Sequence, residues 1–219
     1  MPIQLYLHLL ITLFFQKPME NKRTFLALGD SYTIGEAVAE SERWPVQFVN
    51  SMNAAGKPFE MPEIVAKTGW TTDELQRGIA DANPRGPYDL VSLLIGVNNQ
   101  YRGNSPQVYK KEFIELVEQA LVFSGNNPQH VVIVSIPDWG VTPFAEGRDR
   151  AKIAQEIDFF NSVNREIAQN FGVTYIDITP HSRNAEKEID LVASDKLHPS
   201  GKMYTYWAKR VFDAMKDRY

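Results

Sequence analysis

The sequence contains no cysteine among its 219 residues. This absence excludes a thiol nucleophile, a disulfide framework and a cysteine-ligated metal site. It leaves the cellular compartment undecided, because proteins without cysteine are stable in both oxidising and reducing surroundings. The chain has only four histidines, and its carboxylates are scattered, so we recognise no set of metal ligands. The sequence therefore predicts neither a metal nor another cofactor.

An excess of basic residues is also lacking. The chain has 23 Lys and Arg against 27 Asp and Glu, which gives a formal net charge of −4. Because nucleic-acid-binding domains usually carry a basic patch, nucleic acid is not an expected partner. The composition, with 43% hydrophobic and 23% charged residues, is ordinary for a globular protein. The length fits one domain whose core needs no covalent cross-link.

No hydrophobic run is long enough for a confident transmembrane helix. The most apolar stretch, residues 5–15, is too short, although its length suits the core of an export signal. No Lys or Arg precedes Lys17, however, and no small-residue cleavage site follows. We therefore treat residues 1–21 as an N-terminal extension without chemistry. A start misassigned upstream of Met19 is favoured over a degenerate export signal, and a packed helix comes third. A cytoplasmic location is accordingly slightly favoured over export.

Short apolar runs alternate with segments of helical periodicity throughout residues 22–219. This alternation predicts an α/β fold, a single-domain three-layer α/β/α sandwich around a mostly five-stranded parallel sheet. No repeat, low-complexity tract or linker divides the segment. The expected strands are 25–28, 63–66, 90–95, 131–134 and 173–178, and the expected helices are 44–52, about 72–77, 106–124, 149–171 and 200–216.

The first expected strand is followed closely by a serine. It ends at Gly29, and Asp30 and Ser31 come next. Open α/β proteins bind ligands at the carboxyl ends of their strands, so Ser31 is placed where chemistry takes place. Taken alone, these are ordinary turn and helix-capping residues. A serine becomes nucleophilic only when a base takes its proton and an acceptor orients that base.

Asp195 and His198, three positions apart, offer such a base and acceptor. A competing pair, Asp177 and His181, follows the last expected strand, and His130 precedes a strand and so lies at the wrong edge of the sheet. A surface Asp and His at this spacing often form only a turn or a weak ion pair. The choice of His198 rests on its position just before the last expected helix and on the motif described next.

Four short motifs, in this order, resemble sequence blocks of the SGNH (GDSL) hydrolases, and they span nearly all of the chain after about residue 22. Each motif is weak alone, but the four in order are specific. They are Gly29-Asp30-Ser31 (block I), Gly69 in Lys67-Thr68-Gly69-Trp70 (block II), Gly96-Val97-Asn98-Asn99 (block III) and Asp195-Lys196-Leu197-His198 (block V). The resemblance implies the flavodoxin-like SGNH fold and ester hydrolysis without a cofactor.

The resemblance also implies a role for each matched residue. Ser31 would be the nucleophile, His198 the general base, and Asp195 the carboxylate that orients it. The oxyanion hole would consist of the backbone N–H groups of Ser31 and Gly69 and the side-chain amide of Asn98. These five residues are the candidate site.

Asn99 departs from the family pattern, which has Asp at this position. The departure puts the supporting role of the position in doubt but leaves the amide donor of Asn98 intact. The chain also lacks the Gly-x-Ser-x-Gly motif, which argues against the elbow of the ordinary α/β-hydrolases.

The expected function is hydrolysis of a carboxylic ester, lysophospholipase-like or short-chain, through an acyl-enzyme. A carbohydrate O-deacetylase, a binding module without catalysis and an acyltransferase are the alternatives. The substrate and the oligomeric state stay undefined, because the pocket depends on loops 36–44, 100–105, 139–150 and 179–194. Arg102 could meet a carboxylate, phosphate or sugar, although an exposed arginine is more often only solvated.

Overall fold

The computed structural model of the chain describes residues 21–219, and five parallel strands form one sheet in the order β2-β1-β3-β4-β5. The strands β1, β3 and β4 are buried along their whole length, as expected where helices cover both faces. The predicted fold class is thus confirmed. Nearly all of the predicted extension, residues 1–21, lies outside the described residues. The strands are β1 (Phe25–Gly29), β2 (Glu63–Ala66), β3 (Leu90–Leu94), β4 (Val131–Val134) and β5 (Thr174–Ile176).

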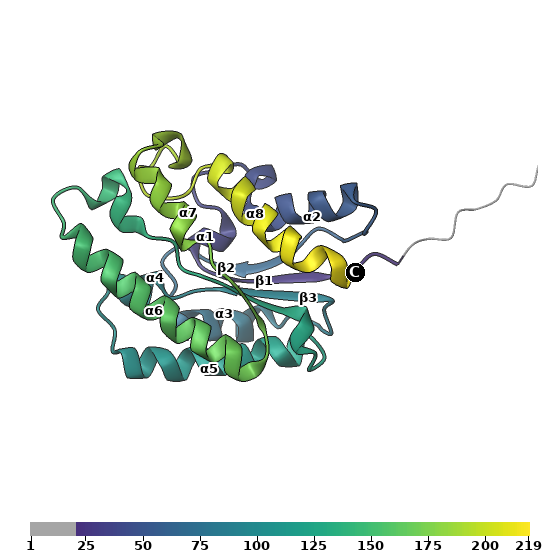
Figure 1. Cartoon of the computed structure of the whole chain (residues 1–219). Coiled ribbons are helices and arrows are strands. Elements are labelled where there is room, and N and C mark those ends of the chain that lie inside the picture. The colour runs from purple at the N-terminus through teal and green to yellow at the C-terminus, as the bar shows by residue number, and fades with distance from the viewer. Residues whose placement is uncertain (1–20) are drawn as a thin grey trace, which may run out of the picture.

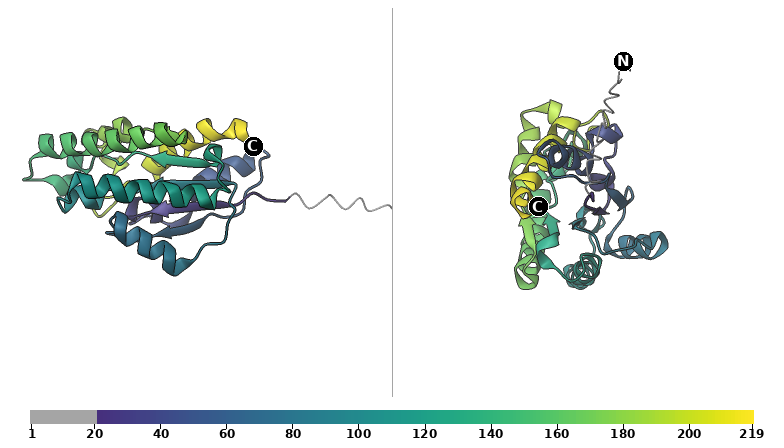
Figure 2. Two further views of the ribbon diagram at one scale, coloured as in Figure 1. Left: turned by 90° about the horizontal axis from the view of Figure 1, so that it is seen from below. Right: turned by 90° about the vertical axis from the view of Figure 1, so that its right-hand side faces the viewer.

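Helices cover both faces of the sheet. On one face α2 (Trp44–Ala54) packs against α8 (Gly201–Met215), and on the other lie α3 (Thr72–Ala82), α5 (Pro106–Phe123) and α6 (Arg150–Phe171) (Figure 1). Seen from below in Figure 2, α6, α5 and α3 lie side by side. Short helices follow three of the strands: α1 (Ser31–Ile34), α4 (Val97–Tyr101) and α7 (Thr179–Ser182). No helix within residues 21–219 is both long and apolar enough to cross a membrane.

The apolar stripes predicted for the helices face the sheet. Trp44 is 1% exposed and its ring centroid lies 6.1 Å from that of Phe25, so it is a core residue rather than part of a substrate cleft. Polar side chains join α2 to α8: Gln47 donates to the carbonyl of Gly201 (3.1 Å) and accepts from the hydroxyl of Thr205 (2.7 Å). The stripes of these two helices bury Val46, Phe48, Val49 and Met52, and Tyr204, Trp207, Val211 and Met215.

Three of the differences from the prediction concern α3, β5 and the segment 179–194. The helix α3 continues past residue 77, because the ring of Trp70 fills the space beside Gly78, where a Cβ would lie 2.0 Å from it. The strand β5 is shorter than 173–178, because the hydroxyl of Ser135 accepts the N–H of Ile178 at 2.8 Å. The segment 179–194 is not wholly irregular, since it contains α7 and two 3₁₀ turns, Arg183–Glu186 and Ile189–Leu191.

The order of the strands creates a crevice at the carboxyl edge between β1 and β3. The chain leaves β1 toward β2 on one side and returns to β3 on the other, and α/β proteins bind ligands at such a point. Gly29, at the end of β1, pairs with Leu94 of β3. A Cβ on Gly29 would lie 2.5 Å from the Leu94 carbonyl oxygen and 2.1 Å from the Thr33 hydroxyl. Position 29, two residues before Ser31, therefore requires glycine.

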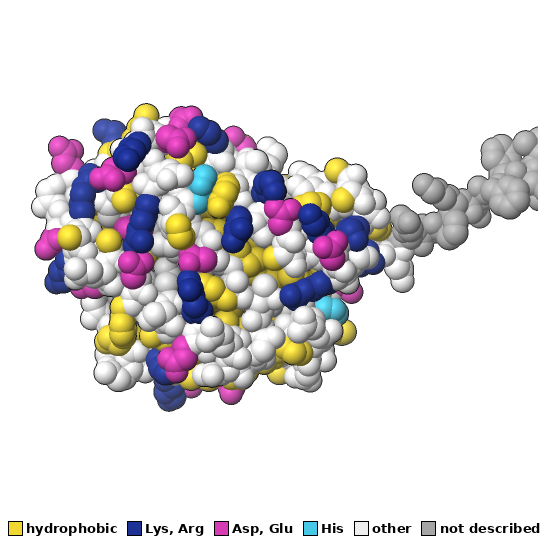
Figure 3. Space-filling model, viewed as in Figure 1, with side chains coloured by type: hydrophobic (Ala, Val, Ile, Leu, Met, Phe, Trp, Pro, Cys, Tyr) yellow, Lys and Arg dark blue, Asp and Glu magenta, His cyan; other side chains and the backbone are white. Residues whose placement is uncertain are grey.

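Tyr219 packs at the opposite, amino edge of the sheet. Its hydroxyl donates to the carbonyl of Asp89 at 2.5 Å, and its ring meets that of Phe59 edge-on with centroids 5.1 Å apart. The guanidinium of Arg23 lies 5.4 Å from the same ring centroid. His130 also lies here, 6.1 Å from the Tyr219 ring, which confirms its predicted place at the wrong edge. On the face shown in Figure 3, basic and acidic side chains are interspersed rather than gathered by sign.

Candidate active site

Ser31 is the first residue of α1, immediately beyond β1. Asp30 is the N-cap of this helix, and one of its carboxylate oxygens, Oδ1, accepts the N–H of Tyr32 at 3.0 Å. The sequence suggested a turn or a cap for these residues, and the structure uses the aspartate as the cap. Ser31 is 4% exposed and opens onto a pocket.

The carboxyl group of Asp30 is fully buried directly beside Ser31. Burial raises the pKa of Asp30 to about 7, against the opposing effect of the backbone N–H groups of Tyr32 and of Asp30 itself. Its second oxygen, Oδ2, has no hydrogen-bond partner among residues 21–219. Burial, and then the negative charge of Asp30, also raise the pKa of the Tyr32 phenol. Both groups therefore favour their neutral forms.

His198 is fixed by Asp195, as the sequence predicted. Asp195 Oδ2 lies 2.5 Å from Nδ1 of the His198 ring, and Oδ1 accepts the N–H groups of Leu197 and His198, both at 3.0 Å. Partial burial is the largest single effect and raises the pKa of Asp195. The hydrogen bonds from the His198 ring and from these two N–H groups together outweigh it, so the net shift of the pKa is downward. The carboxylate thus stays ionised and directs Nε2 of His198 away from itself.

The turn that carries Asp195 and His198 is tied down on several sides. The His198 carbonyl accepts the N–H of Ala193 at 2.7 Å, and the Lys196 carbonyl accepts the N–H of Phe144 at 3.0 Å. The ring of Tyr32 meets the His198 ring edge-on, with centroids 5.6 Å apart. The last contact packs the residue after Ser31 against His198 and so links the turn to α1.

One pocket of about 180 Å³ brings three of the five candidate residues together. Ser31 and His198 face it from α1 and from the turn before α8, and Asn98 faces it from α4. Asp195 stands behind the imidazole. Among residues 21–219 no hydrogen bond joins Ser31 to His198. The remaining lining residues are Tyr32, Val97, Tyr101, Trp139, Phe144 and Leu197.

Gly69, the fifth candidate, lies beside this pocket rather than in its lining. It has a φ of 85°, a conformation that glycine adopts without strain. Its carbonyl accepts a hydrogen bond from Arg102 Nη2 at 2.6 Å, and the Asn98 amide donates to the carbonyl of Trp70 at 2.9 Å. Within residues 21–219 the N–H of Gly69 donates no hydrogen bond. The loop after β2 is thus anchored to α4 through its carbonyls, and the Gly69 N–H is left available.

Arg102, which the sequence suggested as a contact for a substrate anion or sugar, is engaged within the protein. Its guanidinium is held by the Gly69 carbonyl and by Glu74, whose carboxylate oxygens lie 3.3 Å away. It is therefore a tie between α4 and the Gly69 loop rather than a cation free to meet a substrate.

Asn99 supports the same loop from the buried side. Its Oδ1 accepts the backbone N–H of Thr72 at 3.1 Å, and its Nδ2 donates to the Thr72 hydroxyl at 2.8 Å. The Thr72 hydroxyl donates its own proton to Glu112. An amide therefore fits this position, because the Thr72 hydroxyl accepts a hydrogen bond from it and the Thr72 N–H donates one to it. The departure from the family pattern has a local explanation.

The competing pair, Asp177 and His181, is not joined. Asp177 accepts from Arg165 at 2.6 Å and from Ser135, whereas the His181 ring stacks on Tyr206 with centroids 3.4 Å apart. Neither residue lines the pocket of Ser31. Nor do residues 21–219 contain any cluster of three or more His, Cys, Asp or Glu side chains placed to hold a metal ion.

The sequence did not single out the aromatic wall of the pocket, which consists of Tyr101, Trp139 and Phe144. The Trp139 ring centroid lies 5.4 Å from that of Tyr101 and 5.9 Å from that of Phe144. Loop 139–150 was expected to shape the pocket, but nothing in the spacing of the three residues indicated that they would meet. They come from α4 and from two separate 3₁₀ turns.

A sequence model of the GDSL-like Lipase/Acylhydrolase family matches residues 27–206 of this chain. The match covers well over half of the sequence and includes every candidate site residue. No curated protein sequence matches the chain.

Solved structures with the same fold include several esterases. The crystal structure of TesA has a TM-score of 0.68 and 16% identity, and the likeness covers 90% of this chain and 100% of TesA. The psychrotrophic esterase EstA from Pseudoalteromonas sp., in a form inhibited by monoethylphosphonate, has a TM-score of 0.69 and 16% identity over 90% of this chain and 98% of EstA. The acetylxylan esterase Axe2 from Geobacillus stearothermophilus has a TM-score of 0.63 and 16% identity over 88% of this chain and 94% of Axe2.

Proposed function

Because the chain belongs to the GDSL-like lipase/acylhydrolase family and is an ester hydrolase, we propose that it is a serine esterase in which Ser31 is the nucleophile and His198 and Asp195 complete the triad. One observation carries this assignment. Ser31 and His198 line the same pocket, and the far side of the His198 ring is bonded to a partly buried carboxylate, Asp195.

In the first half of the reaction, Ser31 Oγ attacks the ester carbon and His198 Nε2 takes its proton. Asp195 stays ionised and stabilises the imidazolium through Nδ1. The hydrogen bond from Ser31 to His198 forms when substrate is bound, since such bonds are often long in free enzymes. His198 then gives the proton to the departing alcohol. In the second half, His198 activates water, which releases the acid and restores Ser31.

The negative charge on the tetrahedral intermediate is met by three donors. They are the N–H of Ser31, the N–H of Gly69 and the side-chain amide of Asn98. Asn98 uses one of its two amide protons on Trp70, which leaves the other for the oxyanion. Loss of one such donor typically lowers kcat by about 10²–10³-fold. The natural substrate is proposed to be a lysophospholipid-like or short-chain ester, and an acetylated carbohydrate is the alternative.

The decisive experiment compares wild type, Ser31→Ala and Ser162→Ala on p-nitrophenyl acetate, butyrate and octanoate. Ser162 is an exposed serine of α6 outside this pocket, so its substitution is a matched control. Activity in wild type and Ser162→Ala, with loss in Ser31→Ala, is the expected result. A p-nitrophenyl phosphonate ester should also phosphonylate Ser31 with release of p-nitrophenol, which adds the mass of the phosphonyl group to the peptide that contains Ser31. Equal rates in all three proteins would end the assignment.

For the location we propose the cytoplasm, in preference to export. The support is the sequence alone, since no positive charge precedes the apolar stretch and no cleavage site follows it. Sequencing the N-terminus of the protein isolated from its native source tests this proposal, and a terminus that reveals cleavage after an export signal would contradict it.

A further inference from the structure

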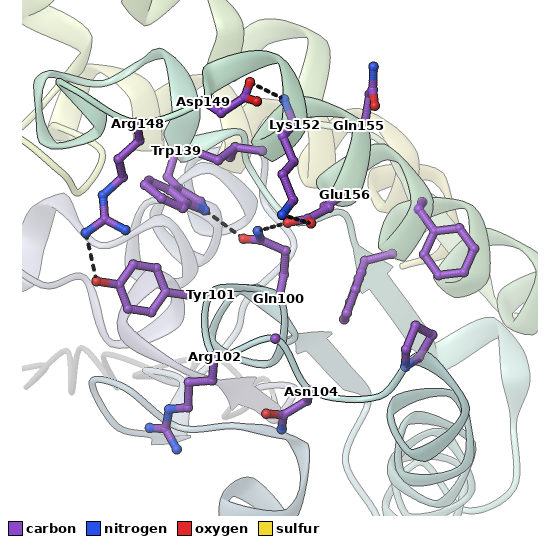
Figure 4. Close-up of a pocket in the computed structure, with 15 residues that line it drawn as sticks. Gln100, Tyr101, Arg102, Asn104, Trp139, Arg148, Asp149, Lys152, Gln155 and Glu156 are labelled. Atoms are coloured by element: carbon purple, nitrogen blue, oxygen red, sulfur yellow. Dashed lines mark hydrogen bonds and ion pairs between the residues drawn. The ribbon is translucent and has the colours of Figure 1, made fainter.

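A second, larger cavity adjoins the pocket of Ser31. It is an open groove of about 810 Å³ between α4, the start of α5 and the first turns of α6 (Figure 4). Tyr101 and Trp139 line both cavities, so the aromatic wall of the Ser31 pocket is also one end of the groove. The two cavities therefore meet at the side chains of these two residues.

Arg148 lies across this shared wall. Its Nη2 donates to the Tyr101 hydroxyl at 3.1 Å, and its guanidinium carbon lies 5.1 Å from the Tyr101 ring centroid. The rings of Trp139 and Phe144 are each 5.3 Å away. Figure 4 shows the side chain of Arg148 extended toward the Tyr101 hydroxyl, at the end of the groove that holds Trp139. Three aromatic faces and one hydrogen bond therefore fix the position of an exposed cation.

The wall behind Arg148 is rigid, because a buried amide holds it. Gln100 is 6% exposed, and its Oε1 accepts the indole N–H of Trp139 at 2.8 Å. Its Nε2 donates to Glu156 of α6 at 2.7 Å. The indole thus cannot rotate without breaking its buried hydrogen bond to Gln100, which Glu156 holds from the other side. A ligand that meets Arg148 meets a preformed site, which lowers the entropic cost of binding.

The charge of Arg148 is not neutralised by the protein. Within residues 21–219 no carboxylate forms an ion pair with it, whereas Lys152 pairs with Glu156 at 3.8 Å. Asp149, the other acid of the groove, caps α6 through the N–H of Lys152 at 3.0 Å. Arg102, also in the lining, is paired with Glu74 as described above.

From these observations we propose that the ester substrate carries an anionic group, a carboxylate or a phosphate, which Arg148 binds at the wall while the ester carbonyl lies at Ser31. The inference rests on the proposed esterase function. Arg148 uses one donor on Tyr101, and the guanidinium keeps four more, enough for a bidentate pair with an anion. Stacking on aromatic faces suits a guanidinium, which is weakly hydrated and so readily gives up water to a ligand.

The experiment uses two matched pairs of esters, which separate the two sources of the anion. The first pair is the mono-p-nitrophenyl ester of glutaric acid and p-nitrophenyl valerate, which differ by an acyl-side carboxylate. The second is 1-butyryl-glycerol 3-phosphate and monobutyrin, which differ by an alcohol-side phosphate. In at least one pair, wild type should prefer the charged ester. Arg148→Gln should raise KM for that ester about ten- to a hundred-fold, as expected for a charge-assisted bond, and change the neutral one less than about three-fold.

Two further variants distinguish binding from structure. Arg148→Lys keeps the charge and should recover part of the lost affinity. Arg77→Gln removes an exposed cation of α3 that pairs with Asp73 outside both cavities, and it should leave both esters unaffected. Added salt should weaken binding of the charged ester only, because it screens the exposed cation. No preference in either pair, or an equal loss on charged and neutral esters in Arg148→Gln, would overturn the proposal.

A binding measurement separates failure of this inference from failure of the esterase assignment. Glutarate, glycerol 3-phosphate and glycerol are titrated into wild type and Arg148→Gln, and binding is measured by isothermal titration calorimetry. Binding of one of the anions to wild type but not to Arg148→Gln supports the anion site even if every ester proves inert. Hydrolysis of neutral esters without anion binding leaves the esterase and removes the anion site.

Discussion

At the level of single residues, one carboxylate sets both the position and the tautomer of the proposed base. Oδ1 of Asp195 holds the backbone of its own turn, and Oδ2 holds the His198 ring. Asparagine is nearly the same shape and can keep the two backbone bonds through its oxygen. Its amide would then present a donor to Nδ1, which favours the wrong tautomer.

We therefore expect Asp195→Asn to lower kcat by about 10⁴-fold, the size of effect known for such a change in a serine protease, with KM nearly unchanged. Steady-state kinetics on p-nitrophenyl butyrate test this expectation, with a denaturation curve to confirm that the variant is folded. A kcat within about ten-fold of wild type would mean that Asp195 does not orient the base.

Asp30 makes the stability of the protein depend on pH. With a folded pKa of about 7 and an ordinary value of 3.8, its carboxyl stays protonated in the folded chain over a range where the unfolded chain ionises. The folded state then holds the extra proton, so the free energy of unfolding falls as the pH rises from about 4 to about 7. Above that range the loss is constant.

Asp30→Asn should remove this dependence and still cap α1, because asparagine is also a good N-cap. At pH 8 we expect the variant to be more stable than wild type by roughly 1–3 kcal/mol, and the gain should vanish below about pH 4. Urea unfolding at pH 4, 6 and 8 gives the answer. A difference that stays constant across these pH values would contradict the interpretation.

At the level of elements, α3 and the Gly69 loop depend on the two faces of Asn99. Aspartate at this position would keep the acceptor for the Thr72 N–H but lose the donor to the Thr72 hydroxyl. That hydroxyl has one proton, which it already donates in a hydrogen bond to Glu112. Asn99→Asp, although it restores the family pattern, should cost about 1–3 kcal/mol of stability, the usual penalty for an unmatched buried polar group.

The double variant Asn99→Asp with Glu112→Gln should recover part of this loss. The new amide at position 112 can donate to the Thr72 hydroxyl, which then donates to the carboxylate introduced at position 99. A double-mutant cycle from urea unfolding measures the coupling, and its sign is the test. Additive effects of the two substitutions would show that the Thr72 hydroxyl does not link them.

The sequence predicted the elements well where one face of a segment decides its structure. The strands β2 and β4 match the expected bounds, because a short apolar run bounded by turn residues is typical of a buried strand. The predicted end of α3 was wrong because the helix continues through Gly78, whose neighbour Trp70 is a tertiary contact that the sequence does not show. The motifs singled out Ser31 and His198, which line one pocket, and Asp195, which bonds to His198. The aromatic wall and Arg148 were not singled out, because side chains from separate segments leave no periodic signal.

At the scale of the whole molecule, the two edges of the sheet carry separate tasks. All candidate residues lie at the carboxyl edge, and the contacts of Tyr219 with Phe59, Asp89 and Arg23 close the amino edge. We expect Tyr219→Ala to lower the free energy of unfolding by about 2–4 kcal/mol, from lost packing and a lost hydrogen bond, while kcat stays within about two-fold. Urea unfolding and ester kinetics on the same sample test both parts, and a parallel fall in kcat would refute the separation.

The proposed nucleophile and base come from distant parts of the chain, and they meet only because α8 packs on α2 and the turn before α8 is tied to neighbouring loops. During synthesis on the ribosome, β1 and Ser31 emerge early, and the segment around His198 emerges long afterwards. A nascent chain therefore exposes a serine that has no base. We therefore expect a nascent chain to have no esterase activity until the segment that carries His198 packs against Tyr32 of α1.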